Sequence, residues 1–404
     1  MKQNYFTKEI VADMLSTSKS TVNSWIRKDK LKSIKPNGKI LIHKNELKQF
    51  DKLNFLFNKK KFIKPKPKRK YSVVELFAGC GGLALGFEKA GLNCLFANDI
   101  DKDSCKTLKE NRPNWNIVNK DINLISDSEF KKLKGANIVS GGFPCQAFSY
   151  AGKKMGFKDT RGTLFYEFAR AVKIIKPQIC IAENVRGLIS HDNGKTLKTI
   201  INVMENDIGY DVITPEICQS IFYEVPQKRE RLFLIGIKKG SGLKFKYPDK
   251  ISEPYTVKDA LKKGKLYKTN VPEAEFQKYT KRKQQIMSKV PGGGNWRDLS
   301  EKLQKEYMGG SYYLGGGKTG IARRLSWDEP SLTLTTAPAM KQTERAHPEE
   351  NRPLTYREYA RIQTFPDNWK FMGSLNSKYK QIGNAVPVNL AKYIGYEIIR
   401  ALNK

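Results

Sequence analysis

Residues 73–82, Val-Val-Glu-Leu-Phe-Ala-Gly-Cys-Gly-Gly, join a short apolar run to a glycine-rich turn. The next residues, 83–90, carry apolar side chains at the spacing of an amphipathic helix. A strand that passes through glycines into a helix leaves backbone amides open to a ligand at the helix N-terminus. One glycine-rich loop is a weak signal, so the fold must be decided by the segments beyond it.

These later segments alternate between strand and helix. Helices are expected at 102–111, 164–175 and 195–207, each between apolar runs. This alternation predicts an α/β fold with a doubly wound, mostly parallel sheet, in which ligands bind at the carboxyl edge of the strands. The expected strands are 73–76, 94–97, 117–118, 137–139, 179–182 and 231–236.

A thiol follows one of these strands. The run Gly-Gly-Phe-Pro-Cys-Gln at 141–146 places Cys145 on a loop at the carboxyl edge, and Pro144 fixes φ immediately before it. A thiolate is a strong nucleophile, whereas an isolated cysteine is more often a small buried hydrophobe. The flanking sequence and three further motifs favour the nucleophile.

Carboxylates end the second strand and follow the third. Asp99, followed by Ile100, stands where a ribose is bound in such folds. Asp121 and Ile122 are placed to meet the amino group and the ring of an adenine. Together with the glycine loop, these residues suit an adenosine-containing cofactor. The chain has no lysine-bearing phosphate loop, which disfavours ATP hydrolysis.

Two further motifs bring charge to the same edge. Glu183, in Glu-Asn-Val, is either a salt-bridged structural carboxylate or a general acid with a raised pKa. Arg229 and Arg231, in Gln-Lys-Arg-Glu-Arg at 227–231, alternate along a strand and so point the same way. They are either surface charge or a clamp for a substrate carbonyl and phosphate.

Charge and composition indicate a nucleic-acid partner. The 404 residues carry 74 Lys and Arg against 40 Asp and Glu, and this net charge of +34 favours a polyanion. A lysine excess also arises from an AT-rich genome, but that explains clustered charge less well. No apolar run can span or anchor in a membrane, and the N-terminus lacks a signal-peptide core, so a cytoplasmic protein is expected. Six cysteines without paired spacing and three histidines predict neither disulfides nor a metal site.

Residues 1–57 form a separate basic module. Helices are expected at 7–15 and 19–27, and Asn37-Gly38 then predicts a β-hairpin. This order resembles a winged helix-turn-helix of the excisionase or MerR kind; the alternative is a basic appendage that only packs on the main domain. The Lys/Pro-rich residues 58–70 predict an extended, semi-rigid linker. The residues expected to read DNA from the second helix are Ser18, Lys19, Ser20, Thr21 and Asn23.

Residues 71–404 resemble bacterial DNA (cytosine-5)-methyltransferases. Five motifs occur in that family's order: Phe-Ala-Gly-x-Gly-Gly, Gly-Gly-Phe-Pro-Cys-Gln, Glu-Asn-Val, Gln-x-Arg-x-Arg and, at 383–387, Gly-Asn-Ala-Val-Pro. The resemblance implies a Rossmann-like domain that binds S-adenosyl-L-methionine, formed by 71–237 and completed by 351–404. It also implies a small target-recognition domain at 238–350, an irregular stretch whose alternative interpretation is a disordered loop.

The resemblance further implies how a flipped cytosine would be methylated. Cys145 would attack C6, and Glu183 would donate a proton or hydrogen bond at N3. Arg231 would hold O2, and Arg229 would help to order the site. The residues implied in DNA contact, on a loop at 146–161 that closes over the base, are Gln146 and Ser149. The residues implied to bind the cofactor are Phe77, Ala78, Gly79, Gly81, Gly82, Asp99, Ile100, Asp121, Ile122, Pro144, Leu164, Asn384 and Ala385.

The sequence departs from the family pattern at two cofactor positions. The family commonly has Glu where Asp99 stands, and often an aromatic residue where Ile100 stands. A shorter carboxylate and a missing ring are expected to weaken cofactor affinity without loss of function. The N-terminal module is an addition that only some members carry.

The implied partner is double-stranded DNA with a short, palindromic target. A monomer is expected, because such an enzyme marks one strand at a time, and a cognate restriction endonuclease would be its partner in the system. An RNA cytosine methyltransferase shares the thiol chemistry and is the nearest enzymatic alternative. A DNA-binding regulator that acts through residues 1–57 is the alternative from another class.

Overall fold

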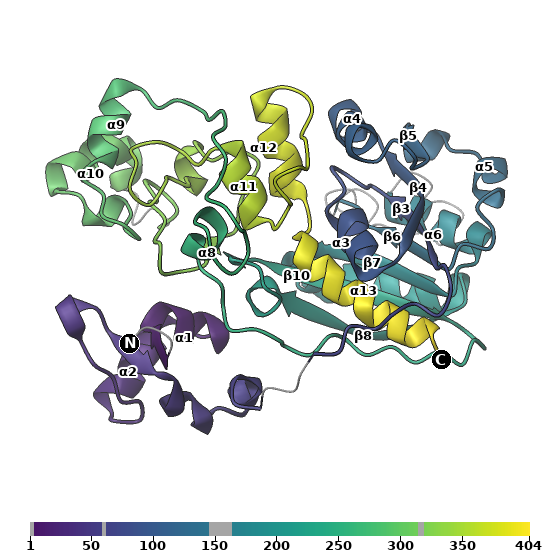
Figure 1. Ribbon diagram of the computed structural model, residues 1–404, viewed down its shortest axis with the longest axis horizontal. Coiled ribbons are helices and arrows are strands. Elements are labelled where there is room, and N and C mark those ends of the chain that lie inside the picture. The colour runs from purple at the N-terminus through teal and green to yellow at the C-terminus, as the bar shows by residue number, and fades with distance from the viewer. Residues whose placement is uncertain (1–3, 59–61, 145–163, 314–318) are drawn as a thin grey trace.

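The computed structural model of the protein describes residues 4–58, 62–144, 164–313 and 319–404. Its centre is a seven-stranded sheet in the order β5-β4-β3-β6-β7-β10-β8, with the first five strands parallel. β10 lies antiparallel between β7 and β8, so the predicted doubly wound, mostly parallel sheet is confirmed (Figure 1). The strands are β3 (Ser72–Leu76), β4 (Asn93–Asp99), β5 (Ile117–Asn119), β6 (Ile138–Gly141), β7 (Ile179–Val185), β8 (Tyr210–Gln219) and β10 (Glu230–Lys238).

Helices cover both faces of this sheet, because successive strand residues point to opposite sides. Val73 belongs to the core shared with α3 and α13, whereas Val74 packs in the core shared with α6. α3 and α13 meet closely: a Cβ on Gly86 would lie 2.3 Å from the Cβ of Ala391. The helices of this domain are α3 (Gly82–Ala90), α4 (Lys102–Asn111), α5 (Asp127–Lys131), α6 (Leu164–Ile175), α7 (Lys195–Asn202) and α13 (Val388–Leu402).

The edge strand β8 was not predicted from the sequence. Its ten residues include Pro215 and lack a clear alternation of apolar and polar side chains. Phe233 pairs with Glu216 and Ile235 with Ile213, so the ladder is irregular around the proline. An edge strand with a bulge tolerates a residue that cannot donate a backbone hydrogen bond.

The N-terminal module contains the predicted helix-turn-helix. α1 (Lys8–Met14) begins after Thr7, whose hydroxyl accepts a hydrogen bond from a backbone amide of the first turn. α2 (Lys19–Arg27) is capped in the same way by Ser18. Such caps satisfy amides that have no partner within the helix, which explains why both helices begin where the sequence predicted.

The predicted hairpin around Asn37-Gly38 is reduced to one antiparallel bridge between Ile34 and Leu41. The short strand β2 (Leu41–His43) pairs instead with β1 (Tyr5–Thr7), which was not predicted. Pro36 begins a 3₁₀ turn between the two arms and has no N–H to donate, so it does not extend a ladder.

The Lys/Pro-rich linker does not stand free but lies along α13. The ring of Phe62 packs on that of Tyr393, with centroids 5.2 Å apart. Asn403 accepts a hydrogen bond from the backbone N–H of Lys68 at 3.0 Å and donates one to the carbonyl of Lys66 at 2.8 Å. The linker therefore fixes the path of the chain into β3.

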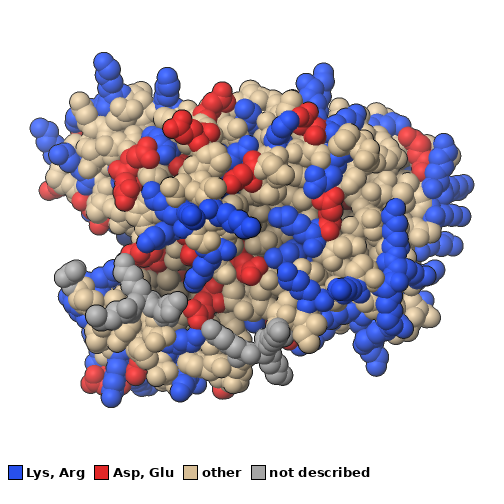
Figure 2. All heavy atoms as spheres, viewed as in Figure 1, with Lys and Arg blue, Asp and Glu red and all other residues tan. Residues whose placement is uncertain are grey.

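Residues 238–350 hold a small core of their own, in which Tyr279, Met287, Trp296 and Ile321 are buried. The first part of this stretch packs on the sheet instead, as the burial of Phe245 in the sheet's core shows. Figure 1 places this lobe and the N-terminal module on the same side of the molecule, and Figure 2 shows a hollow between them. The helices of the lobe and its connection to the sheet are α8 (Val257–Leu261), α9 (Lys281–Met287), α10 (Glu301–Met308), α11 (Tyr356–Ile362) and α12 (Leu375–Asn384).

Within the described ranges, no helix combines the length and apolar character that crossing a membrane requires.

Candidate active site

A buried ion pair lies at the carboxyl edge of β7. Because β10 runs antiparallel beside β7, the start of β10 meets the end of β7, and Arg231 Nε lies 2.7 Å from Glu183 Oε1. Both side chains are buried. Burial raises the pKa of Glu183, while Arg231 and Arg229 oppose the rise. A carboxyl with a raised pKa can give a proton to a substrate near neutral pH.

The loop that leads to Cys145 is held against this pair. A Cβ on Gly142 would lie 2.8 Å from Glu183 Oε2, so the backbone there passes directly over the carboxylate. Asn184 Nδ2 donates to the carbonyl of Phe143 at 2.8 Å, and the Phe143 ring packs on that of Phe165 in α6. Asn184 therefore positions this loop, a role that its place in the Glu-Asn-Val motif could have suggested.

Part of the predicted site lies outside the described residues. This concerns Cys145 and the closing loop with Gln146 and Ser149. The roles assigned to these residues stay predictions. The exposed Pro144 is the last described residue before them.

Arg229 is buried at the gap between β9 (Gln227–Lys228) and β10. Its guanidinium donates to the carbonyls of Leu334 at 3.1 Å and Gly383 at 2.9 Å. Burial and the nearby Arg231 lower the pKa of Arg229 well below the usual value, and Glu183 opposes this shift. Arg229 thus joins the start of β10 to the segments at 333–334 and 383–384, which agrees with the predicted ordering role.

A pair of buried amides, which sequence reasoning missed, extends this connection. Gln227 Nε2 donates to Gln363 Oε1 at 2.9 Å, and Gln227 Oε1 accepts from the N–H of Leu334 at 3.0 Å. Gln363 Nε2 in turn donates to the carbonyls of Ile382 and Ala385. Gln363 lies outside the five motifs, so the sequence held no sign of its part.

The glycine loop after β3 is shaped by Asp99. Its carboxylate accepts the backbone N–H of Gly79 at 2.7 Å and that of Asp101 at 2.8 Å. Burial raises its pKa, and these two hydrogen bonds oppose the rise. Phe77, Gly79 and Gly81 all have positive φ, and Gly81 caps α3. The side chain predicted to bind a ribose thus also holds the loop open.

The predicted adenine residues differ in exposure. Ile100 is 69% exposed, whereas Ile122 is only 3% exposed and belongs to the core. Asp121 Oδ1 accepts hydrogen bonds from the backbone and side-chain nitrogens of Asn123. Leu124, which sequence reasoning missed, is 67% exposed close to the end of β5. The apolar surface at this edge therefore comes from Ile100 and Leu124.

The other predicted cofactor residues lie around the same edge. Ala78 and Gly82 are buried, and an added Cβ on Gly82 would lie 2.3 Å from the carbonyl oxygen of Val386. Leu164 is half-buried at the start of α6. Asn384 is exposed and Ala385 half-buried at the end of α12.

The predicted DNA-reading residues of α2 are only partly free. Ser18 is exposed, but its hydroxyl oxygen accepts from the N–H of Thr21 at 3.0 Å. Lys19 and Ser20 are exposed, whereas Thr21 and Asn23 are half-buried. The most accessible part of this helix is its first turn.

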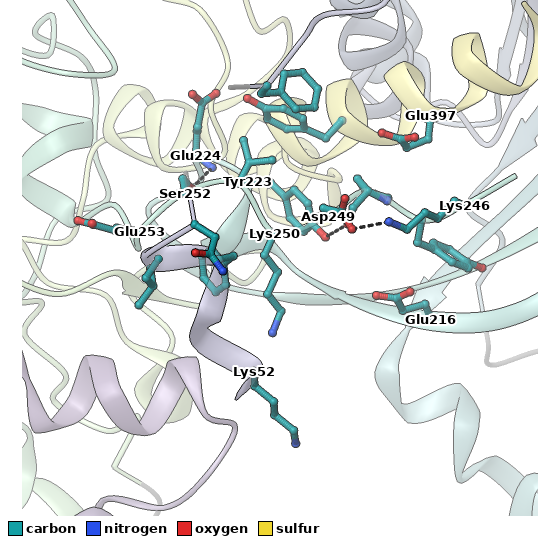
Figure 3. A pocket seen from close by; sticks show the side chains of 18 of the residues that line it. Lys52, Glu216, Tyr223, Glu224, Lys246, Asp249, Lys250, Ser252, Glu253 and Glu397 are labelled. Atoms are coloured by element: carbon teal, nitrogen blue, oxygen red, sulfur yellow. Dashed lines mark hydrogen bonds and ion pairs between the residues drawn. The ribbon is translucent and has the colours of Figure 1, made fainter. Parts of the chain in front are cut away.

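A cavity of about 1600 Å³ lies away from this site. It separates the N-terminal module from the outer side of β8 and is lined by both signs of charge, including Lys52, Glu216 and Lys250 (Figure 3). It contains none of the motif residues that meet at the carboxyl edge.

Comparison with known proteins agrees with this arrangement. The model of the C-5 cytosine-specific DNA methylase family matches residues 71–400, and a helix-turn-helix domain model matches residues 5–50. The chain belongs to the C-5 cytosine-specific DNA methylase family. Because the family match covers residues 71–400, the chain is a DNA (cytosine-5)-methyltransferase. Enzymes of this family use S-adenosylmethionine.

Similar relatives span the whole chain, including the N-terminal module. Type II methyltransferase M.Eco47II of Escherichia coli is 54% identical, over 100% of this chain and 97% of its own length. Type II methyltransferase M.Sau96I of Staphylococcus aureus is 45% identical, over 100% and 96%. A solved structure described as a DNA modification methyltransferase of an E. coli prophage superposes with a TM-score of 0.61 at 27% identity, covering 83% of this chain and 100% of its own.

Proposed function

We propose that this methyltransferase modifies cytosine at C5 within a short duplex sequence, as the modification enzyme of a type II restriction–modification system. The observation that carries the chemistry is the buried Glu183–Arg231 pair beside Gly142, on the loop that leads to Cys145. The biological setting is supported by relatives named Type II methyltransferases that match the whole chain.

In this proposal, the cytosine leaves the helix and is bound between these groups. The Cys145 thiolate forms a bond to C6, and the electron pair of the C5–C6 double bond moves into the ring. Glu183 gives its proton to N3 and so neutralises the charge that develops there. Arg231 holds O2, and Arg229 keeps Arg231 and the 383–384 segment in place.

The second half of the reaction restores the ring. Bound S-adenosylmethionine would supply the methyl group that C5 accepts, and the remainder of the cofactor would leave as S-adenosylhomocysteine. N3 then returns its proton to Glu183, a base removes the proton from C5, and the C6–S bond breaks to reform the double bond. The buried Glu183 thus acts twice, first as an acid and then as a base, and a raised pKa suits both steps.

The residues at the glycine loop fit this cofactor. Among the described residues, nothing lies within 4 Å of a Cβ built on Gly79, which leaves room for a ligand against the backbone. Asp99 would accept hydrogen bonds from ribose hydroxyls, and the exposed Ile100 and Leu124 would flank the adenine. Asp121 would receive the adenine amino group.

Residues 238–350 would read the target sequence, since the two remaining regions supply the chemistry and the helix-turn-helix. The N-terminal module would bind DNA through Ser18, Lys19, Thr21 and Asn23, either at an operator of its own gene or on the methylated duplex. The high positive charge of the chain supports DNA contact by both regions.

The proposal is tested by expression in a host that lacks cytosine methylation, followed by bisulfite sequencing of the genome. We expect 5-methylcytosine at one short motif, and none when Cys145→Ser is expressed at the same level. A genome without 5-methylcytosine, from soluble protein that binds the cofactor, would contradict the proposal and favour RNA as the substrate.

A further inference from the structure

Three parts of the chain meet at Lys228, the residue between Gln227 and Arg229. Lys228 Nζ lies 2.6 Å from Asp13 Oδ2 in the N-terminal module. It also lies 3.5 Å from Glu329 Oε2 in the lobe formed by residues 238–350, called the recognition lobe below. All three side chains are at least three-quarters buried. Burial raises the pKa of Asp13, and Lys228 opposes that rise. The N-terminal module is therefore joined to the catalytic strand one residue away from Arg229.

Further contacts hold the module in this position. Gln219 Nε2 donates to Ser16 Oγ at 2.9 Å, and Lys39 Nζ lies 2.9 Å from Asp328 in the recognition lobe. The ring of Phe55 packs on Phe222, with centroids 5.4 Å apart. The contacts reach both the catalytic domain and the lobe, so the module is not a freely tethered domain.

These contacts place the turn before α2 near Arg229 and Arg231. Lys19, the first residue of α2, pairs with Glu9 at 3.3 Å and also acts electrostatically on Asp13. A cavity of about 420 Å³ is lined by Ser16 and Thr17, just before α2, and on its other side by Arg229 and Arg231. In helix-turn-helix proteins, the N-terminal residues of the second helix contact base edges.

We propose that the N-terminal module is a fixed part of the methylation complex and contacts the same duplex as the active site, on one side of the target cytosine. This inference deepens the proposed function and rests on it. Arg186 lines this cavity and is 65% exposed in its pair with Glu230, and Lys19, at the start of α2, is 55% exposed in its pair with Glu9. Both can therefore reach phosphates of a duplex that brings a cytosine to Arg231.

The hollow between the module and the recognition lobe, seen in Figure 2, agrees with a duplex held between them. Two linked binding surfaces on one ligand raise affinity by roughly 10²–10⁴-fold when the geometry allows both to engage. The Asp13–Lys228–Glu329 cluster is the device that sets this geometry. Asp13 is thus a positioning residue, and it acts through the module rather than on the substrate.

The test uses the full-length protein and duplexes selected from a random library for binding, so that the probe does not depend on turnover. The selected sequence is placed either centrally or with one flank shortened to a few base pairs. For the wild type, we expect that shortening one flank raises KM by about tenfold or more, while shortening the other has little effect. Hydroxyl-radical footprints should extend farther on the sensitive side.

Asp13→Lys places a positive charge against Lys228 and should abolish this asymmetry, in both KM and footprint. Asp51→Lys is the matched control: it adds the same charge to the same module at an exposed carboxylate, which accepts a hydrogen bond from Asn54 within the module. It should keep the asymmetry. Melting curves show that both variants are folded; if Asp13→Lys is not, the milder Asp13→Asn takes its place.

The outcomes separate this inference from the proposed function. A wild type that methylates but is indifferent to both flanks overturns the inference and leaves the proposed function intact. Asymmetry that survives in folded Asp13→Lys also overturns it. Absence of methylation counts against the proposed function, while the footprint of Cys145→Ser protein on the same duplexes still shows whether the module lies on the bound DNA.

Discussion

The start of β10 and the docking face of the N-terminal module are both built from ion pairs, but they differ in depth. The Glu183–Arg231 pair is buried and faces the loop to Cys145. The Lys39–Asp328 pair of the module is about half exposed, whereas the module's Asp13–Lys228 pair lies deeper. Burial of charges carries a large desolvation penalty, so breaking a buried pair is strongly destabilising. Exposed pairs contribute little to the free energy of unfolding.

The largest expected effect lies at the buried end of this comparison. Glu183→Gln keeps the shape of the side chain and an acceptor for Arg231 but cannot donate a proton to N3. We expect single-turnover methylation to slow by about 10²–10⁴-fold, beyond any loss of stability from leaving the buried Arg231 without a carboxylate, which melting curves measure.

The pH profile gives a second readout of the same change. Because burial raises the pKa of Glu183, wild-type activity should fall as pH rises through that pKa and Glu183 loses its proton. Glu183→Gln should lose this descending part of the profile. A folded variant that retains activity within a factor of about ten would contradict the role of Glu183.

Removal of the partner cation should affect stability. Arg231→Leu leaves the Glu183 carboxylate buried without its ion pair, and we expect a loss of about 3–5 kcal/mol in the free energy of unfolding. The pKa of Glu183 then rises further, so the unfolded chain releases its proton at a lower pH than the folded one. The loss should therefore be larger at pH 8 than at pH 5.

A double replacement serves as the control for Arg231→Leu. Arg231→Leu with Glu183→Leu removes both charges, and it should recover most of the stability while methylation stays absent. Urea unfolding at the two pH values measures both variants. Equal stability of the single and double variants would show that burial of an unpaired charge is not the cause.

An effect of similar size but opposite sign is expected at Glu75, a buried carboxyl of β3 whose pKa is raised by burial to about 8. The unfolded chain ionises near pH 4.5 while the folded protein keeps the proton, so this group costs stability as pH rises from about 4.5 to 8. Glu75→Gln should match the wild type near pH 4.5 and exceed it by about 4 kcal/mol at pH 8. Urea unfolding across this pH range measures the difference, and a parallel decline of both proteins would refute the expectation.

The smallest effect is expected at the exposed end of the comparison. Lys39→Ala removes a pair whose side chains are 43% and 52% exposed, and we expect less than about 1 kcal/mol in unfolding. Lys44→Ala is the matched comparison, because Lys44 is only 14% exposed in its 2.5 Å pair with Glu253. Thermal melts at low and high salt should show a larger loss of melting temperature for Lys44→Ala than for Lys39→Ala. The reverse order would contradict the link between the burial of an ion pair and its contribution to stability.

The sequence predicted six strands of the central sheet, because their apolar runs are continuous, while the roles of the candidate site residues stay predictions. It did not predict how Glu183 and Arg231 meet. Their contact arises because β10 inserts beside β7 while β8, earlier in the chain, takes the edge. The irregular pairing around Pro215 interrupts the alternation of apolar residues, so this edge strand could not be predicted from that pattern.

Single exposures were also beyond the sequence. Ile122 and Leu124 are similar side chains two residues apart, yet one is in the core and the other faces solvent, because the 3₁₀ turn at Ile122–Leu124 redirects the chain. The docking of the N-terminal module depends on Asp13 and Lys228, which are 215 positions apart and belong to no shared motif. Such pairs become visible only when the domains are placed together.

The packing of α13 on α3 sets the order of events while the chain is made. The Tyr71 hydroxyl donates to the carbonyl of Leu402, 331 residues later, and the linker before β3 rests on the same helix. The helix-turn-helix is complete by residue 57 and leaves the ribosome first, and domains generally fold as units from the N-terminus. The sheet must wait for α13, so the N-terminal module is made well before the sheet can be completed.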